Sequence, residues 1–179
     1  MNRIVIGKER NSTRRKGTEM GKLIATTQAT LDGVVDPVAD WVMPGGDHGE
    51  YSFERQSGSG AMLLGRKTYE GLAGYWPEQP DSDPWAKWLN PFPKYVGSRS
   101  LAGELDWNAT ALDGEISESI PKLKDVVDGD LYHHGSGEFA HALAEEGLVD
   151  LYEVYLNPLV YGEGNVHVLG DRGRVDMKL

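Results

Sequence analysis

The sequence contains no cysteine, and this absence removes several classes of function at once. Disulfide bridges, thiolate zinc sites and cysteine nucleophiles are all excluded. A cytosolic protein needs no disulfides, so we expect a cytoplasmic location. Long apolar runs are also missing. Because a membrane-spanning helix needs roughly 18 or more apolar residues in a row, we expect no membrane partner. No apolar segment near the start resembles a secretory signal.

Positive charge is scarce as well. The 179 residues include 18 Lys and Arg against 28 Asp and Glu, a net charge of −10. Residues 1–20 run against this trend with six basic and two acidic side chains, so the remainder is more acidic than the whole. Because a domain with this much negative charge repels the phosphate backbone of nucleic acids, we expect no nucleic-acid partner. Any anion site must be built locally, from backbone N–H groups and a few Arg or Lys side chains.

Residues 1–20 lack apolar periodicity, and we interpret them as a disordered basic extension. A transit peptide or a nucleic-acid arm is the alternative to a nonessential extension. Residues 21–179 are expected to form one domain, because their length suits one and no repeat or linker divides them.

From residue 22 onward, strand patterns alternate with helix patterns. Strands are predicted at 22–30, 61–64, 94–98, 107–112, 130–134 and 151–160, and helices at 47–57, 66–73, 116–127 and 138–146. Residues 31–46 are predicted to form a long loop, and 75–93 a Pro- and Trp-rich stretch with a helical turn at 85–89. Strands separated by helices predict an α/β domain with a largely parallel sheet. Residues 166–169 and 174–179 are predicted to pair as further strands, with antiparallel pairing near the end.

Three predicted strands end in turns rich in glycine or small residues, at 65–68, 98–100 and 135–137. Open α/β sheets bind ligands outside the carboxyl ends of their strands. We therefore predict that these three turns meet on one dinucleotide.

The first turn, GRKT, lies where a strand passes into a helix. Gly65 permits a close turn, and the helix N-terminus offers free N–H groups to a phosphate. Thr68 adds a hydroxyl, and Arg66 and Lys67 supply positive charge. The alternative is a surface helix with two solvated basic residues.

The other two turns are SRS and GSGEF. Arg99, between Ser98 and Ser100, has a planar guanidinium that suits a phosphate monoester, although SRS alone is often an ordinary turn. In the third turn, the candidates for pyrophosphate contact are three small residues whose main chain a ligand can approach closely; they are Gly135, Ser136 and Gly137. We expect Glu138 to point outward.

The pair His133 and His134 suggests metal or acid–base chemistry at first sight. Adjacent residues of a strand point to opposite faces, so both cannot easily bind one ion. No cluster of carboxylates stands at ligand spacing. We predict no metal site and leave both histidines out of the catalytic set, although one of them could line the cofactor pocket.

For the substrate pocket we consider the loop after the first strand and the aromatic segment GYWP. Asp32 is a candidate for binding a heterocycle and for catalysis; its alternative is a turn-forming Asp-Gly. Asp47 is a candidate proton-relay carboxylate with Glu50 as its competitor, and its alternative is a helix N-cap. The remaining candidates for substrate binding are aromatic, and their alternative role is to cover the core; they are Trp41, Tyr75 and Trp76.

Taken in order, the segments LDGVV (31–35), GRKTYE (65–70), YVGSRS (95–100), GSGEF (135–139) and GLVDLYEVYLNPLVYGEG (147–164) resemble the RibD C-terminal reductase domain. This resemblance implies a dihydrofolate reductase-like fold, a mixed, mostly parallel sheet flanked by helices. It also implies NADPH as hydride donor and frequently a homodimer. By resemblance, Arg66 lies near the adenosine 2′-phosphate, Thr68 on the pyrophosphate, and residues 98–100 at the adenine ribose and its 2′-phosphate.

The resemblance further implies hydride transfer to a small heterocycle or sugar-imine substrate, by analogy 5-amino-6-(5-phosphoribosylamino)uracil in riboflavin biosynthesis. Two departures weaken this substrate assignment. The final segment RVDMKL stops where such domains continue into a closing strand, and the zinc deaminase motif of the two-domain enzymes needs cysteines that are absent. Dihydrofolate reduction and a nucleotide-binding module without catalysis are the alternatives.

Overall fold

The computed structural model describes residues 3–7, 20–42, 46–164 and 166–168, with the side chains of 3–7, 46–48 and 166–167 outside the description. Its strands are β1 (Arg3–Gly7), β2 (Leu23–Ala29), β3 (Val34–Asp36), β4 (Ala61–Gly65), β5 (Lys94–Gly97), β6 (Glu104–Leu105), β7 (Ala109–Ala111), β8 (Leu131–His134), β9 (Leu151–Leu156) and β10 (Val166–His167). Its helices are α1 (Gly46–Ser57), α2 (Arg66–Ala73), α3 (Pro84–Leu89), α4 (Ile116–Val126) and α5 (Glu138–Glu145), with 3-10 turns η1 (Val38–Asp40) and η2 (Trp76–Glu78).

The main sheet has eight strands in the order β1-β9-β2-β8-β4-β5-β7-β6. All pairs from β9 to β7 are parallel, and the outermost pairs, β1 with β9 and β6 with β7, are antiparallel. The predicted mixed, mostly parallel sheet flanked by helices is therefore confirmed. Parallel neighbours need crossover connections; helices provide most of them, and residues 98–108 with β6 connect β5 to β7.

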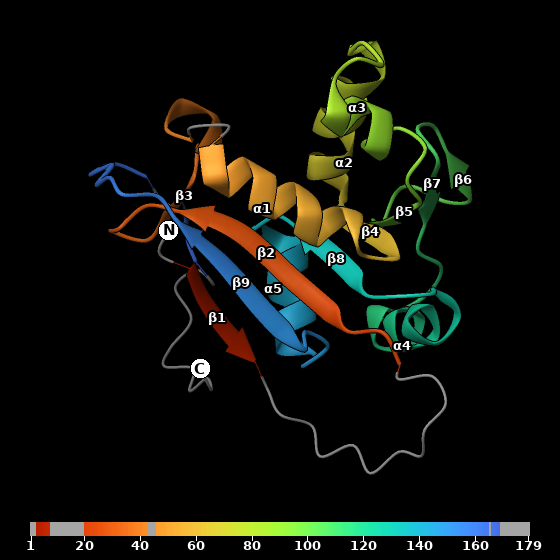
Figure 1. Ribbon diagram of the computed structural model, residues 1–179. Helices are drawn as coiled ribbons and strands as arrows, with labels where there is room; N and C mark the ends of the chain where they lie inside the picture. Colours follow the sequence, from red (N-terminus) through yellow and green to blue (C-terminus); the bar gives the residue numbers. More distant parts are fainter. Residues whose placement is uncertain (1–2, 8–19, 43–45, 165, 169–179) are drawn as a thin grey trace.

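Helices cover both faces of the sheet (Figure 1). On one face, which we call the α5 face, Ile120 of α4 and Leu143 of α5 pack against Leu23, Leu63 and Leu131. On the other, the α1 face, Tyr69 of α2 and Leu89 of α3 pack against Met62, Leu64 and Val96. Alternate residues of one strand thus reach different cores, as the two-residue period of a strand requires.

Two expectations about the fold need correction. The extension at 1–20 was expected to be disordered, but Arg3–Gly7 forms β1 and pairs with β9. The loop at 31–46 contains strand β3, which pairs with β10. Residues 174–179 lie outside the described residues. The antiparallel pairing expected near the end involves β10, whereas β9 runs parallel to β2.

Short length and distant pairing partners explain why β1 and β3 were missed. β3 is only three residues long, VVD, and a run of this length carries too little periodicity to be recognised. β1 is a single apolar stretch within a basic segment, and the partner that completes it lies about 150 positions along the chain, as in Arg3 with Tyr155. Partners so distant leave no local pattern.

Candidate functional site

The three predicted turns lie together at one end of the sheet. Gly65 of β4 is in register with Gly97 of β5, and Leu64 of β4 with His134 of β8. The segments that follow, residues 65–68, 97–100 and 135–137, therefore leave three neighbouring parallel strands at the same edge, which we call the carboxyl edge. Figure 1 shows α2 and α5 starting from this edge on opposite faces.

Two of the glycines at this edge are required by a packing contact. A Cβ on Gly97 would lie 2.1 Å from the Phe139 ring, and one on Gly65 would lie 3.1 Å from the Phe139 Cβ. Gly65 has an ordinary backbone conformation, with φ −77° and ψ 155°, so the turn itself does not demand glycine there. We expected glycine at position 65 because of a close turn, and this reason is wrong. Gly65 and Gly97 instead leave room for the first turn of α5 to pack against β4 and β5.

The third turn is different, because its glycines face open space or polar groups. Gly135 has φ +136°, which favours glycine, and a Cβ there would lie 3.3 Å from the Thr68 hydroxyl. Nothing lies within 4 Å of a Cβ placed on Gly137. Ser136, between them, is partly exposed. The main chain of this turn is therefore open at Gly137, whereas the Thr68 hydroxyl stands beside Gly135.

The helices that start at the carboxyl edge begin without side-chain caps. Neither Gly65 before α2 nor Gly137 before α5 supplies a capping side chain. By contrast, Asp83 caps α3 and accepts hydrogen bonds from the N–H groups of Trp85 and Ala86 at 2.8 and 3.3 Å. Uncapped N-termini leave N–H donors and a partial positive charge for an anion.

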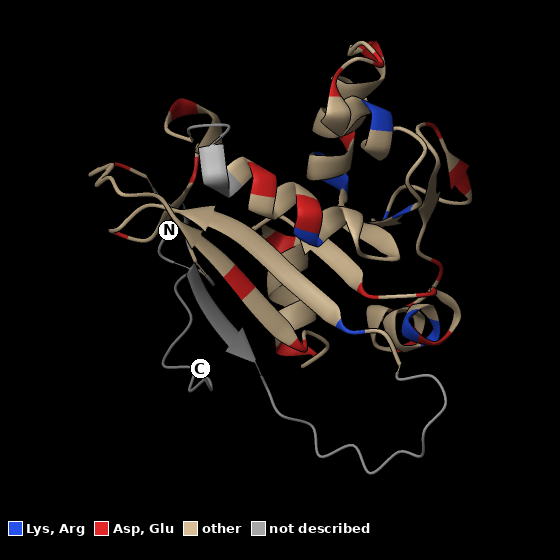
Figure 2. Ribbon diagram, in the orientation of Figure 1, with Lys and Arg blue, Asp and Glu red and all other residues tan. Residues whose placement is uncertain are grey.

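Three cationic side chains stand at the same edge, and all are exposed: Arg66, Lys67 and Arg99. Arg66 makes a surface ion pair with Glu70 at 3.2 Å, a contact worth little free energy and easily exchanged for another anion. Figure 2 shows basic positions on α2, whereas the charged positions on α1 are chiefly acidic. This donor set, free N–H groups with Arg and Lys beside them, fits a ligand that carries a diphosphate and a further phosphate.

Ser98 has a structural role in its turn. Its Oγ accepts hydrogen bonds from the N–H groups of Ser100 and Leu101, both at 3.1 Å. The hydroxyl of Ser100 lies 3.3 Å away from that of Ser98. The two serines of SRS therefore stabilise an ordinary turn, which was the alternative interpretation of this segment. Arg99 is the side chain of the segment that remains available to a ligand.

The two adjacent histidines point to opposite faces, as expected. His133 lies on the α5 face, where its ring meets Phe139 edge-on at 5.5 Å and its Nδ1 lies 2.8 Å from the Leu63 carbonyl oxygen. Because a carbonyl only accepts, this contact assigns the proton to Nδ1. Burial lowers the pKa of His133 to about 4. His134 is on the α1 face, partly exposed, and its buried Nδ1 has no hydrogen-bond partner among the described residues.

Asp32 is held by its own loop. Its carboxylate accepts hydrogen bonds from the Thr30 hydroxyl at 2.5 Å and from the N–H groups of Tyr161 and Gly162 at 3.2 and 2.9 Å. These hydrogen bonds, of which the one from Thr30 has the largest effect, lower the pKa of Asp32 to about 2. A carboxylate that stays ionised and joins two loops suits the turn-forming role better than proton donation.

The remaining substrate candidates occupy different environments. Trp41 is buried, with its Nε1 unpartnered among the described residues. Tyr75 is 56% exposed and meets Trp76 edge-on at 5.2 Å, while Trp76 packs against the core of the α1 face. Asp47 lies in the first turn of α1, but its side chain is outside the described residues. Among the described side chains, no hydrogen bond or ring contact joins Trp41, Tyr75 or Trp76 to Asp32.

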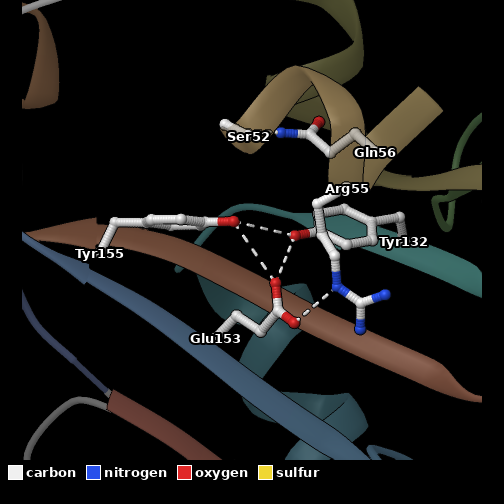
Figure 3. Close-up of polar contacts among 6 residues, drawn as sticks. All are labelled: Ser52, Arg55, Gln56, Tyr132, Glu153 and Tyr155. Carbon is white, nitrogen blue, oxygen red and sulfur yellow. Dashed lines mark hydrogen bonds and ion pairs between the residues drawn. The ribbon is translucent and has the colours of Figure 1, made fainter. Parts of the chain in front are cut away.

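A buried polar cluster between α1 and the sheet was not predicted (Figure 3). Glu153 of β9, with no exposed surface, receives the Arg55 Nε at 2.9 Å and the Tyr132 hydroxyl at 2.7 Å. The Tyr155 hydroxyl adds a longer bond to Glu153, and Gln56 bonds Ser52 beside them on α1. Burial raises the pKa of Tyr132, so its hydroxyl remains a donor. The sequence signal that could have found this cluster is a glutamate in the otherwise apolar strand LYEVYL.

Neither a metal-binding group of three or more His, Asp and Glu side chains nor a helix long and apolar enough to cross a membrane is found within the described residues.

Comparisons with known proteins agree with this geometry. The RibD C-terminal domain family matches residues 21–179. An uncharacterized protein of Bacillus subtilis (strain 168), YyaP, is 28% identical over 165 residues, which cover 88% of this chain and 86% of that protein. The structure of a putative riboflavin biosynthesis protein from Shewanella sp. PV-4 is similar with a TM-score of 0.62 and 19% identity, covering 86% of both chains.

Two further structures extend the likeness. A Thermotoga maritima diaminohydroxyphosphoribosylaminopyrimidine deaminase/5-amino-6-(5-phosphoribosylamino)uracil reductase matches at a TM-score of 0.59 and 13% identity, covering 87% of this chain but only 50% of that one. Enterococcus faecalis dihydrofolate reductase complexed with NADP(H) and RAB-propyl matches at a TM-score of 0.54 and 18% identity. The match covers 83% of this chain and 77% of that one. The fold is thus dihydrofolate reductase-like, and the chain belongs to the RibD C-terminal domain family.

Proposed function

We propose that this protein is an NADPH-dependent reductase that transfers a hydride to a C=N or C=O group of a small polar heterocycle or sugar imine. By its family, the first acceptor to consider is 5-amino-6-(5-phosphoribosylamino)uracil. NADPH supplies the hydride when bound, and the chain's own residues bind, orient and shield the reacting groups.

The observation that carries this proposal is the meeting of three strand ends at the carboxyl edge. The Gly135 turn presents open main chain beside the Thr68 hydroxyl, and two helices start there without side-chain caps. In the proposed assignment, residues 135–137 and Thr68 hold the pyrophosphate. Arg66, Lys67 and Arg99 hold the adenosine 2′-phosphate, because a planar guanidinium matches a phosphate and distinguishes NADPH from NADH.

The test follows NADPH oxidation with purified protein and 5-amino-6-(5-phosphoribosylamino)uracil, with dihydrofolate as the competing acceptor. In parallel, the gene is introduced into a riboflavin auxotroph and into a folate-reductase-deficient strain. We expect oxidation with the uracil substrate and growth of the first strain only. Growth of the second strain would transfer the assignment to dihydrofolate.

A second candidate is a nucleotide-binding module without catalysis. The ion pair of Arg55 and Glu153 favours it, because this pair and its tyrosines fill the space between α1 and the sheet with groups that bond to one another. NADPH binding without turnover on any acceptor would establish this alternative.

The homodimer and the cytoplasmic location belong to the same proposal. The family resemblance supports both, and light scattering of the purified protein measures the first directly. We expect a mass close to twice the 19.7 kDa of one chain.

A further inference from the structure

His134 is a polar side chain that the fold itself does not use. It ends β8, directly before the Gly135 turn, and its buried Nδ1 has no hydrogen-bond partner among the described residues. Its neighbour His133 bonds the Leu63 carbonyl through Nδ1, and the buried Nε2 of His133 likewise lacks a partner among the described residues. A buried nitrogen left without a partner costs stability, so such a group in a folded protein calls for an explanation, such as a bound ligand or water.

The strand order indicates which part of a dinucleotide would lie near His134. The exposed cations Arg66, Lys67 and Arg99 follow β4 and β5, on one side of β8. If the 2′-phosphate lies there and the pyrophosphate at the Gly135 turn, the other half of the molecule must extend from β8 toward β2. At that position His134 is in register with Thr26 of β2, and Thr26 with Glu153 of β9.

The side chains of this row face α1. Glu153 reaches Arg55 of α1, and the strand period places His134 on the same face as Glu153 because Thr26 links the two in register. His133 lies on the opposite face with Phe139. His134 is therefore the histidine of the pair that a nicotinamide bound on the α1 face would meet.

We propose that His134 binds the carboxamide of the cofactor's nicotinamide ring, an inference that rests on the proposed function. A carboxamide has one acceptor and one donor group, and a neutral imidazole has one of each as well. Burial lowers the pKa of His134, which keeps the ring uncharged at neutral pH. An uncharged ring suits this place because the oxidised nicotinamide is cationic, and a second positive charge would repel it.

The test measures binding by calorimetry, with no turnover. The titrants are NADP⁺, its 3-acetylpyridine analogue, which lacks the carboxamide NH₂, and adenosine 2′,5′-bisphosphate, which lacks the nicotinamide half. We expect His134→Phe to weaken NADP⁺ binding about tenfold, the effect of one lost hydrogen-bonded contact, and to leave the bisphosphate within about twofold. The wild type should prefer NADP⁺ to the analogue, and His134→Phe should abolish that preference.

Two variants control for changes in shape. His134→Asn restores one donor and one acceptor near the Nδ1 position, and it should recover most of the NADP⁺ affinity. Asp125→Ala changes an exposed side chain in the last turn of α4, away from the carboxyl edge, and should bind NADP⁺ like the wild type.

The outcomes separate the two proposals. Equal NADP⁺ affinity of wild type and His134→Phe overturns the assignment of His134 alone. An equal loss for NADP⁺ and the bisphosphate overturns it too, because it indicates a structural role. If the wild type binds neither molecule, the proposed function fails together with this inference.

Discussion

The two ends of the parallel strands are built in opposite ways. At the amino end, Asp150 accepts from the Leu23 N–H at 2.9 Å and from the buried Lys124 amine. Two glycines there are tightly packed. A Cβ on Gly21 would lie 2.1 Å from the Gly129 oxygen, and a Cβ on Gly60 would lie 2.4 Å from the Asp128 oxygen. At the carboxyl edge, helix starts are uncapped and Arg66, Lys67 and Arg99 are exposed.

This difference separates stability from function within one sheet. At the amino end the chain satisfies its own charges and main-chain donors, so substitutions there should alter the free energy of unfolding. At the carboxyl edge donors and cations remain available, so substitutions there should alter ligand affinity. Phe139 and His133 mark the boundary, because they form the packed layer on which the open turn rests.

The largest effect is expected from Asp150→Ala. Lys124 has only 4% of its side chain exposed, so removal of its partner leaves a buried charge uncompensated. We expect a loss of about 3 kcal/mol in the free energy of unfolding, measured with urea, and unchanged NADPH affinity. Glu118→Ala is the control, since it breaks an exposed pair with Lys122 and should change stability by less than about 0.5 kcal/mol. Comparable losses in the two variants would contradict the contrast.

The second effect is a pH dependence of the free energy of unfolding, caused by His133. Its pKa is lowered to about 4 in the folded protein, while the unfolded chain takes up a proton near the ordinary value of 6.5. The unfolded state therefore binds more protons between these values, and the free energy of unfolding falls as pH drops from about 6.5 to about 4. The expected decline is on the order of 3 kcal/mol. His133→Asn keeps a donor for the Leu63 carbonyl without titrating, and its urea curves should lack this component.

The third effect concerns the two kinds of glycine. Gly97→Ala places a methyl group against the Phe139 ring and should cost about 1–3 kcal/mol of stability. Gly137→Ala meets open space, so its stability should stay within about 0.5 kcal/mol while NADPH affinity falls. Combining Gly97→Ala with Phe139→Ala should cost less than the sum of the two single changes. Strict additivity would show that the two groups do not compete for the same space.

Much of this fold was predictable because its elements carry local patterns. The strand and helix periods of residues 61–73 and 130–145 define β4, α2, β8 and α5, and the order of these elements implies the parallel sheet. The convergence of the three turns follows from that topology. Strands β1 and β3 are short and depend on distant partners, so no local period marks them. Strand β10 lies within the predicted strand at 166–169, but its pairing with β3 was not predicted.

Side-chain partnerships were less predictable than the backbone. Arg55 and Glu153 are 98 positions apart, and nothing near either residue indicates the other. The role of Gly65 and Gly97 depends on Phe139, whose ring position only the packed structure gives. Asp32 was recognised as a turn or a site, and only its three hydrogen bonds favour the turn.

The most direct test of the central claim is a comparison of NADPH and NADH affinities for the wild type and for Arg66→Ala. If three strand ends hold one NADP-type dinucleotide, the wild type binds NADPH more tightly than NADH. The replacement should then reduce NADPH affinity about tenfold, with little effect on NADH, because one charge-assisted contact to the 2′-phosphate is lost. Equal affinity of the wild type for the two cofactors, or no affinity for either, would contradict the account.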